Sequence, residues 1–234
     1  MNSKKVELEI VKLSSASSKW WDQRYAAEDG MLWGGGLNNT VKAIPQTIPK
    51  NSKILVIGFG YGRELIHLVK QGYDVHGIDF SKKAKEQTLV NLKKNGLKCN
   101  NLVTSKFEYQ NTYKSNEFDF IIGHRALQLV IDTDIMKLWA EITYRLLKPN
   151  GVLLLSCRNK KDIESGLVKM NSENQYEHTN REGHLLSLWG RNEFNLYFSK
   201  YFEKISFQDY TETESMKVGA ECNLTLMKAI KKSK

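Results

Sequence analysis

The residues best suited to chemistry form a glycine-rich loop and a carboxylate that follows it. Gly58, Gly60 and Gly62 come directly after the branched, apolar run Ile54–Ile57. Glycine suits such a loop because it accepts unusual backbone angles and, lacking a Cβ, lets a ligand approach the main chain. Asp79 ends the next apolar run, about 20 residues further on. This order predicts a nucleoside site in which the carboxylate accepts both hydroxyls of a ribose.

The spacing of the glycines argues against a dinucleotide ligand. A dinucleotide pyrophosphate favours G-x-G-x-x-G/A, in which the sixth residue is small so that the helix can pack closely. Here Gly62 stands fifth and Arg63 sixth. A nicotinamide oxidoreductase is therefore the least favoured of the nucleoside-binding classes.

The surrounding sequence predicts the elements that position these residues. Between residues 52 and 156, apolar runs alternate with helical patterns, which is typical of a parallel sheet wound with helices. The predicted strands are 54–57, 74–80, 100–105, 118–122 and 152–156. Three helices are predicted: one from the glycine loop to Gly72, one from Ser81 to about Gly96, and one over 135–146. Residues 204–213 and 223–230 read as two further strands, and a tight connection would make that pair antiparallel.

Two segments lie outside this alternation. Trp20, Trp21, Tyr25 and Trp33 crowd together ahead of the first strand, which favours an accessory helix folded over the core or over a ligand. Residues 158–190 have no clear period and are expected to be irregular. A long segment of this kind after the carboxyl end of a strand is typical of a lid or binding loop.

Composition narrows the function classes. The chain has 234 residues, 41% of them hydrophobic, and a net charge of +9. Residues 51–110 carry 10 Lys and Arg against 5 Asp and Glu, and most of these lysines lie between residues 82 and 98 on one predicted helix. No aromatic residue lies among them for bases to stack on, so a solvated helix face is favoured over a nucleic-acid surface.

Cysteine and histidine usage predicts a metal-free protein of a reducing, cytoplasmic setting. Cys99, Cys157 and Cys222 are odd in number and scattered, so neither a disulfide framework nor a zinc site is expected. His178 and His184 lack a Cys or carboxylate partner at ligand spacing, so no metal is expected there either. No apolar run approaches the roughly 20 residues that span a bilayer.

Four motifs together resemble the class I S-adenosylmethionine-dependent methyltransferases. They are Ile54–Glu64, Asp79–Ser81, Phe118–Ile122 and Leu146–Leu153, and the resemblance extends over about residues 20–230. It implies an α/β fold with a Rossmann-like, seven-stranded, mostly parallel sheet, helices on both faces and a C-terminal antiparallel strand pair. It also implies S-adenosyl-L-methionine as the cofactor.

The resemblance further implies where the cofactor binds. The methionine part belongs near Gly58 and Gly60, the ribose on Asp79, and the adenine near Phe80 and the end of the third strand. Family members commonly carry an Asp at that end, and here the matching residues are Ser105, Lys106 and Phe107. The Ser105 hydroxyl or the backbone around Phe107 would then hold the adenine. The full predicted cofactor set is Gly58, Phe59, Gly60, Gly62, Asp79, Phe80, Ser105, Lys106, Phe107, His124, Trp33 and Tyr25.

The acceptor is expected beside the end of the fourth strand, at Gly123–Leu127. This stretch lacks the Asp/Asn-Pro-Pro-aromatic tetrad of base-modifying amino methyltransferases and the glutamate pair of the protein-arginine type. It resembles the thiopurine- and tellurite-type small-molecule methyltransferases, which implies that Arg125 faces the acceptor and that Trp21, Tyr25 and Trp33 form an aromatic lid. We predict that Arg125 binds or polarises the acceptor while His124 orients it or takes a proton. The alternative is that Arg125 pairs with a neighbouring acid and His124 only packs.

The sequence as a whole predicts one methyltransferase domain over residues 1–234. Its parts are an aromatic helical lid at 1–50, a cofactor-binding core at 51–157, an irregular acceptor-side segment at 158–192, and a C-terminal helix and strand pair at 193–234. The expected partner is a small-molecule nucleophile: a thiol or other soft nucleophile, an amine or a hydroxyl. The alternatives are an RNA or protein methyltransferase and a catalytically silent cofactor-binding protein.

Overall fold

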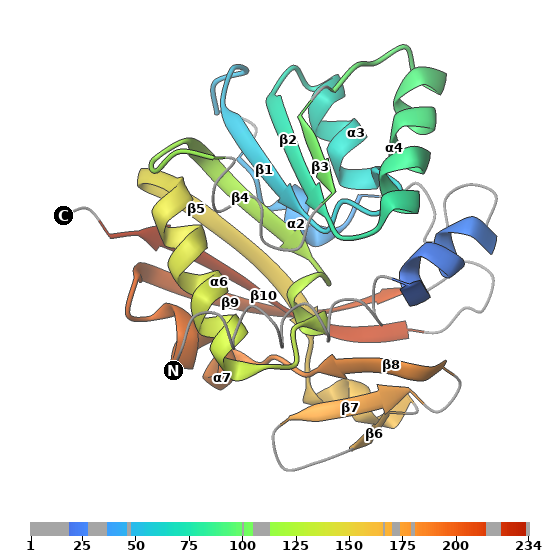
Figure 1. The fold of residues 1–234 in the computed structure, drawn as a ribbon. Coiled ribbons are helices and arrows are strands. Elements are labelled where there is room, and N and C mark those ends of the chain that lie inside the picture. Colours follow the sequence, from blue (N-terminus) through green and yellow to red (C-terminus); the bar gives the residue numbers. More distant parts are fainter. Residues whose placement is uncertain are drawn as a thin grey trace.

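The order of the strands places the glycine loop at the centre of the molecule. The computed structural model describes residues 19–27, 37–45, 48–99, 101–104, 113–165, 167–169, 174–178, 181–213 and 221–232. Seven strands form one sheet in the order β3-β2-β1-β4-β5-β10-β9 (Figure 1). They are β1 (Lys53–Ile57), β2 (Asp74–Asp79), β3 (Leu102–Thr104), β4 (Phe118–His124), β5 (Leu147–Arg158), β9 (Phe202–Thr213) and β10 (Glu221–Lys231).

The first five strands are parallel, and β10 pairs antiparallel with both β5 and β9. The predicted sheet and its closing antiparallel pair are thereby confirmed. From β1 the chain winds outward to β2 and β3, and it then returns to build β4 and β5 on the other side of β1. The carboxyl ends of β1 and β4 therefore meet at the point where the strand order reverses, which is where open α/β sheets bind their ligands.

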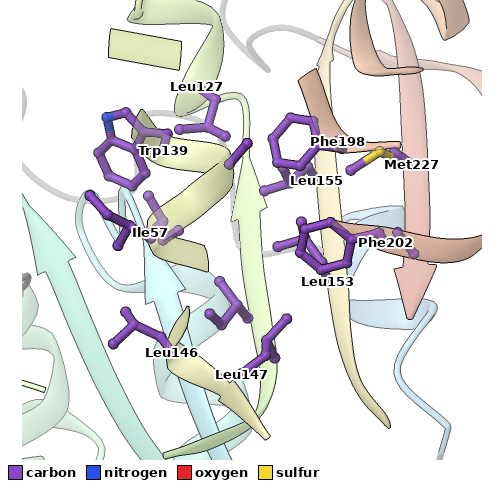
Figure 2. Close-up of a cluster of buried hydrophobic side chains, with 14 of the residues drawn as sticks. Ile57, Leu127, Trp139, Leu146, Leu147, Leu153, Leu155, Phe198, Phe202 and Met227 are labelled. Carbon is purple, nitrogen blue, oxygen red and sulfur yellow. The ribbon is translucent and has the colours of Figure 1, made fainter. Parts of the chain in front are cut away.

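Helices cover both faces of the sheet because its central strands are apolar on both sides. The helices are α2 (Asn39–Lys42), α3 (Arg63–Lys70), α4 (Lys82–Lys94), α6 (Thr133–Leu146) and α7 (Arg191–Phe198), with 3-10 turns η1 (Leu127–Leu129) and η2 (Lys160–Ser165). Ile54 and Val56 of β1 pack with α2, α3 and α4, while Leu55 and Ile57 point to the α6 and α7 side. Figure 2 shows this second face, where Ile57, Leu153 and Leu155 of the sheet lie near Trp139 of α6 and Phe198 of α7.

Side-chain caps fix where the two long helices begin. The Ser81 hydroxyl accepts a hydrogen bond from the backbone N–H of Ala84 at the start of α4. The Asp132 carboxylate accepts from the N–H groups of Asp134 and Ile135 at the start of α6. Each cap satisfies backbone donors that the first helical turn leaves unpaired. The predicted start of this helix at Ser81 is confirmed.

The expectation of an irregular segment after β5 is wrong for its described residues. The segment contains η2 and a three-stranded antiparallel sheet of β6 (Leu167–Lys169), β7 (Gln175–His178) and β8 (Arg181–Ser187), drawn in orange in Figure 1. Its small core holds Leu167, Tyr176, Leu186 and Leu188. These strands are short and bury few apolar side chains, so the alternation that marks a strand in sequence is too brief to detect.

None of the helices in the described ranges is long and apolar enough to cross a membrane. Among those same residues, no group of three or more His, Cys, Asp or Glu side chains is placed to hold a metal ion.

Candidate active site

The glycine loop makes a tight turn between β1 and α3. The N–H of Gly58 donates to the carbonyl of Ile78 on β2 at 2.7 Å. Gly58 and Gly60 have φ values of +69° and +55°, in the left-handed region that side chains with a Cβ rarely adopt. A Cβ at Gly58 would lie 2.5 Å from the Cβ of Ala126, and one at Gly60 would lie 2.8 Å from the Tyr25 hydroxyl. Both positions therefore require glycine.

Two side chains of α4 donate hydrogen bonds to backbone carbonyl groups of this loop. The Thr88 hydroxyl donates to the Gly60 carbonyl at 2.8 Å, and the Asn91 amide donates to the Tyr61 carbonyl at 3.0 Å. Gly62 begins α3 with a φ of +91°, and a Cβ there would lie 2.9 Å from the Thr88 side chain. The third glycine thus allows close packing between the loop and α4.

Asp79 ends β2 beside the loop. One carboxylate oxygen accepts from the N–H of Gly60 at 2.9 Å, and the other accepts from the N–H of Ser81 at 2.9 Å. Burial raises the pKa of Asp79 to about 6, although these backbone hydrogen bonds favour the charged form. The backbone of Phe80 also favours the charged form, and a carboxylate has about four lone-pair sites, so acceptor capacity remains for a ligand hydroxyl.

A pocket at the ends of β1, β2 and β4 brings most of the predicted site residues together. Its lining includes Gly58, Phe59, Gly60, Asp79, Phe80, His124, Arg125 and Tyr25. The side chain of Phe59 is 1% exposed, so Phe59 offers the pocket its backbone while its ring packs in the core. Gly62 is not part of this lining.

Aromatic residues from two distant segments cover the pocket. Residues 19–27 are helical, and Tyr25 from this segment is buried over Gly60. The Trp21 ring stacks on Tyr25 with a centroid distance of 5.5 Å. The Trp20 ring stacks on His184 of β8 at 4.5 Å. The N-terminal helical segment and the small sheet therefore meet at the pocket.

Four side chains from four elements form a hydrogen-bonded chain at the other end of the pocket. The Thr40 hydroxyl donates to the Ser156 hydroxyl at 2.8 Å, and Ser156 Oγ lies 2.8 Å from His124 Nδ1. The other ring nitrogen of His124, Nε2, lies 3.1 Å from a carboxylate oxygen of Glu212 on β9. Both nitrogens of His124 are therefore engaged within the protein.

The surroundings of His124 and Glu212 shift the pKa values of both side chains. Burial lowers the pKa of His124, opposed by the hydrogen bond with Glu212. Burial by itself would raise the pKa of Glu212, but the hydrogen bond from His124 and the charges of Arg63 and Arg125 outweigh it and lower that pKa. At neutral pH the pair is consequently a neutral imidazole donating to an ionised carboxylate.

Arg125 lies between this chain and the glycine loop. Its backbone N–H donates to the Ser156 carbonyl at 2.7 Å, and its φ is +57°. Such a backbone conformation is uncommon for a residue with a Cβ and is often found at functional sites. Arg63 also lines the pocket, where its guanidinium contacts the Glu64 carboxylate at 2.7 Å.

Comparison with known proteins agrees with this geometry. Residues 55–155 match the family model described as a methyltransferase domain. The matched range runs from β1 to β5 and contains the glycine loop, Asp79, His124 and Arg125. Over this range the chain is similar to a methyltransferase domain.

The relatives of this chain carry different names. The chain is 29% identical over 167 residues to a ubiquinone biosynthesis O-methyltransferase of Pelagibacter ubique, with 65% of each protein aligned, so it spans just under two thirds of that relative. It is 26% identical over 161 residues to EEF1A lysine methyltransferase 2 of Danio rerio, covering 61% of this chain and 69% of the relative. A solved methyltransferase structure from Methanosarcina mazei has a TM-score of 0.66 at 19% identity and covers 80% of this chain and 95% of its own.

Four of the predicted site residues lie outside the described residues: Trp33, Ser105, Lys106 and Phe107. Several residues that line the pocket were not predicted from the sequence, above all Glu212 and His184. Glu212 lies more than 80 positions after His124 and reaches it only because β9 closes the far edge of the sheet. No local sequence pattern signals such a contact.

Proposed function

We propose that this chain transfers a methyl group from S-adenosyl-L-methionine to a small-molecule nucleophile. The observation that carries the proposal is the buried carboxylate of Asp79, which accepts from the N–H of Gly60 and lines the same pocket as the loop. A carboxylate at this position suits the two hydroxyls of a ribose, and the close contacts at Gly58 and Gly60 leave room there only for backbone. These residues fit the nucleoside of the cofactor.

The chemistry that the cofactor supplies is a methyl group on a positively charged sulfur, which departs as a neutral thioether. The protein then needs mainly to align the attacking atom with the methyl group, and such positioning alone lowers a barrier substantially. Gly58 and Gly60 hold the backbone that the cofactor lies against. Tyr25 and Trp21 cover the pocket and exclude water from it.

At the acceptor end, Arg125 binds an anionic or polar group of the acceptor. It lines the pocket, and its left-handed backbone conformation directs the chain past the end of β4. The role that we propose for His124 differs from the two predicted from the sequence, which were to orient the acceptor or to take a proton. Because its two nitrogens are already engaged by Ser156 and Glu212, His124 acts by orienting Glu212 rather than by taking a proton from the acceptor directly.

Calorimetry with S-adenosylhomocysteine and with NADH tests the cofactor. We expect binding of the first and not of the second. Asp79→Ala should weaken S-adenosylhomocysteine binding by roughly ten- to a hundredfold, as expected for the loss of hydrogen bonds to a charged acceptor. Asp74→Ala, at the exposed opposite end of the same strand, is the control and should bind as the wild type does. Equal binding by the Asp79 variant would contradict the assignment.

A labelled methyl-donor assay with a panel of phenols, amines, thiols and oxyanions tests the acceptor class. We expect Arg125→Ala to reduce turnover while S-adenosylhomocysteine affinity stays the same. Methylation in the presence of a cell lysate, with the label found in protein instead of in small molecules, would favour the second candidate. That candidate is a protein lysine methyltransferase, which the relative from Danio rerio supports.

A further inference from the structure

Glu212 is an acidic side chain that no sequence pattern places at this pocket. It lies near the end of β9, lines the same pocket as Gly58, Asp79 and Arg125, and its side chain is 19% exposed. Among the described residues, its carboxylate makes one hydrogen-bonded contact, with Nε2 of His124. A carboxylate bound on one side only keeps lone pairs with which to accept a hydrogen bond from a ligand.

The contacts behind Glu212 are compatible with one order of donors and acceptors, and the Tyr210 phenol lies beside the two hydroxyls of this chain. The Thr40 hydroxyl donates to Ser156 Oγ, so the Ser156 hydroxyl has its own hydrogen available for Nδ1 of His124. His124 then accepts at Nδ1 and carries its proton on Nε2, which donates to Glu212. Thr40 and Ser156 are fully buried and cannot exchange these roles with water. The chain therefore holds the Glu212 carboxylate in a fixed orientation.

We propose that Glu212 receives the proton of the methyl acceptor, and that the site accordingly takes an acceptor whose reacting atom carries O–H or N–H. His124, Ser156 and Thr40 are positioning residues for that carboxylate. The proposal rests on the proposed methyl transfer and narrows its acceptor to hydroxyl or amine compounds.

The step balances without a further reactant. The bond between the sulfur and the methyl carbon breaks, and its electron pair stays on sulfur. The bond between the methyl carbon and the acceptor oxygen or nitrogen forms. The proton leaving that oxygen or nitrogen moves to Glu212, which becomes a neutral carboxylic acid and later releases the proton to solvent.

The charges around Glu212 favour this acceptor class over a preformed anion. The charged and titratable groups that face the Glu212–His124 pair are Arg63 and Glu64 of α3, Arg125 after β4 and Tyr210 of β9. Arg63 is paired with Glu64, and both Arg63 and Arg125 favour the charged form of Glu212. A thiolate approaching Glu212 would face a like charge in a partly desolvated site, whereas a neutral hydroxyl or amine would donate a hydrogen bond to it.

Nuclear magnetic resonance of the His124 ring tests the pairing without any acceptor. In the protein saturated with S-adenosylhomocysteine, we expect the ring to remain neutral, protonated on Nε2, below the pH at which an ordinary histidine titrates. Glu212→Gln should lower the pKa of His124 further, because the opposing carboxylate is removed. An unchanged His124 ring in Glu212→Gln would overturn the proposal.

The acceptor panel tests the proton transfer. Glu212→Gln should reduce kcat for hydroxyl and amine acceptors by roughly a hundredfold or more, as is typical for loss of a general base, while S-adenosylhomocysteine affinity stays within twofold of the wild type. Glu221→Gln, an exposed glutamate on the neighbouring strand, is the matched control and should keep full turnover.

The positioning role of His124 has its own readout. His124→Gln should raise the pKa of Glu212 and shift the acid limb of the kcat/KM profile to higher pH, an effect that simple loosening of the fold would not produce. Full turnover in Glu212→Gln, or a wild-type protein that methylates thiols alone, would overturn this proposal and leave the proposed methyl transfer standing. Failure to bind S-adenosylhomocysteine, or binding without methylation of any panel member, would instead contradict the proposed function itself.

Discussion

The cofactor half and the acceptor half of the pocket are built in different ways. The cofactor half consists of the loop at residues 58–62 and the end of β2 at Asp79, which are close in sequence and joined by backbone hydrogen bonds. The acceptor half combines the end of β4 with residues from β8 and β9, while Tyr25 of the helical segment 19–27 lies over the loop of the cofactor half. One half depends on backbone geometry and the other on side chains that long-range packing brings together.

This difference determines how each half responds to substitution. In the cofactor half, an added Cβ would clash with the Cβ of Ala126 at Gly58 or with the Tyr25 hydroxyl at Gly60. In the acceptor half, a substitution removes one side-chain contact and leaves the strands in place. We therefore expect substitutions in the cofactor half to change cofactor affinity most strongly. Substitutions in the acceptor half should mainly change which acceptor is methylated.

The largest expected effect is that of Gly58→Ala. The added methyl group would lie 2.5 Å from the Cβ of Ala126, and the residue has a φ of +69°. We expect S-adenosylhomocysteine affinity to fall by about a hundredfold or more, measured by calorimetry, because the loop must move away from β4. The control is Gly72→Ala, which has a φ of +84° but nothing within 4 Å of its Cβ.

Both alanine variants should lose stability in thermal unfolding, since each carries the cost of a left-handed residue, about 1–2 kcal/mol. Only Gly58→Ala should lose binding. Equal affinities in the two variants would mean that the contact between the loop and β4 does not shape the cofactor half.

The cofactor half could be predicted from the sequence because its information is local. A buried strand, a glycine turn, a helix and a terminal acid follow one another within about 30 residues, and parallel α/β topology places the two strand ends side by side. The same reasoning correctly predicts the outer strands β9 and β10 as an antiparallel pair. It assigned Gly62 to the cofactor, whereas the closest contact of a Cβ at that position is with Thr88 of α4.

The acceptor half could not be predicted because its contacts depend on tertiary structure. His124 was identified by its place after a strand, but its partners Thr40, Ser156 and Glu212 come from α2, β5 and β9. Nothing in the residues near Glu212 shows that this side chain, rather than its neighbours on the strand, faces the pocket. The small sheet of β6–β8 was not predicted because β6 and β7 have only three and four residues, and β8 carries apolar residues only at Leu185 and Leu186.

The pH dependence of cofactor affinity is a smaller expected effect that also distinguishes the two halves. Burial raises the pKa of Asp79 to about 6, so its carboxylate gains a proton as the pH falls through that value. A protonated carboxyl can no longer accept from both ribose hydroxyls. We expect S-adenosylhomocysteine affinity, measured by calorimetry, to fall below about pH 6 by roughly tenfold per pH unit.

The unliganded protein should respond in the opposite direction. Because the folded state binds this proton more tightly than the unfolded state does, the contribution of Asp79 to stability decreases as the pH rises from about 4 to 6. Asp79→Asn should remove the pH dependence of binding, while Glu212→Gln should retain it. A pH profile that follows Glu212 instead would place the titrating group in the acceptor half.

The smallest expected effect concerns the contact that joins the two halves. His184 of β8 stacks on Trp20 of the helical segment that covers the glycine loop, with a centroid distance of 4.5 Å. An aromatic contact of this kind contributes about 0.5–1.5 kcal/mol. His184→Ala should therefore increase amide hydrogen exchange in residues 19–27 by up to about tenfold, measured by mass spectrometry, with little change in the seven-stranded sheet.

His67→Ala, on the partly exposed side of α3, is the control and should exchange as the wild type does. If exchange in residues 19–27 is unchanged in His184→Ala, the aromatic cover is held by Tyr25 and the glycine loop alone, and the small sheet has no part in closing the cofactor half.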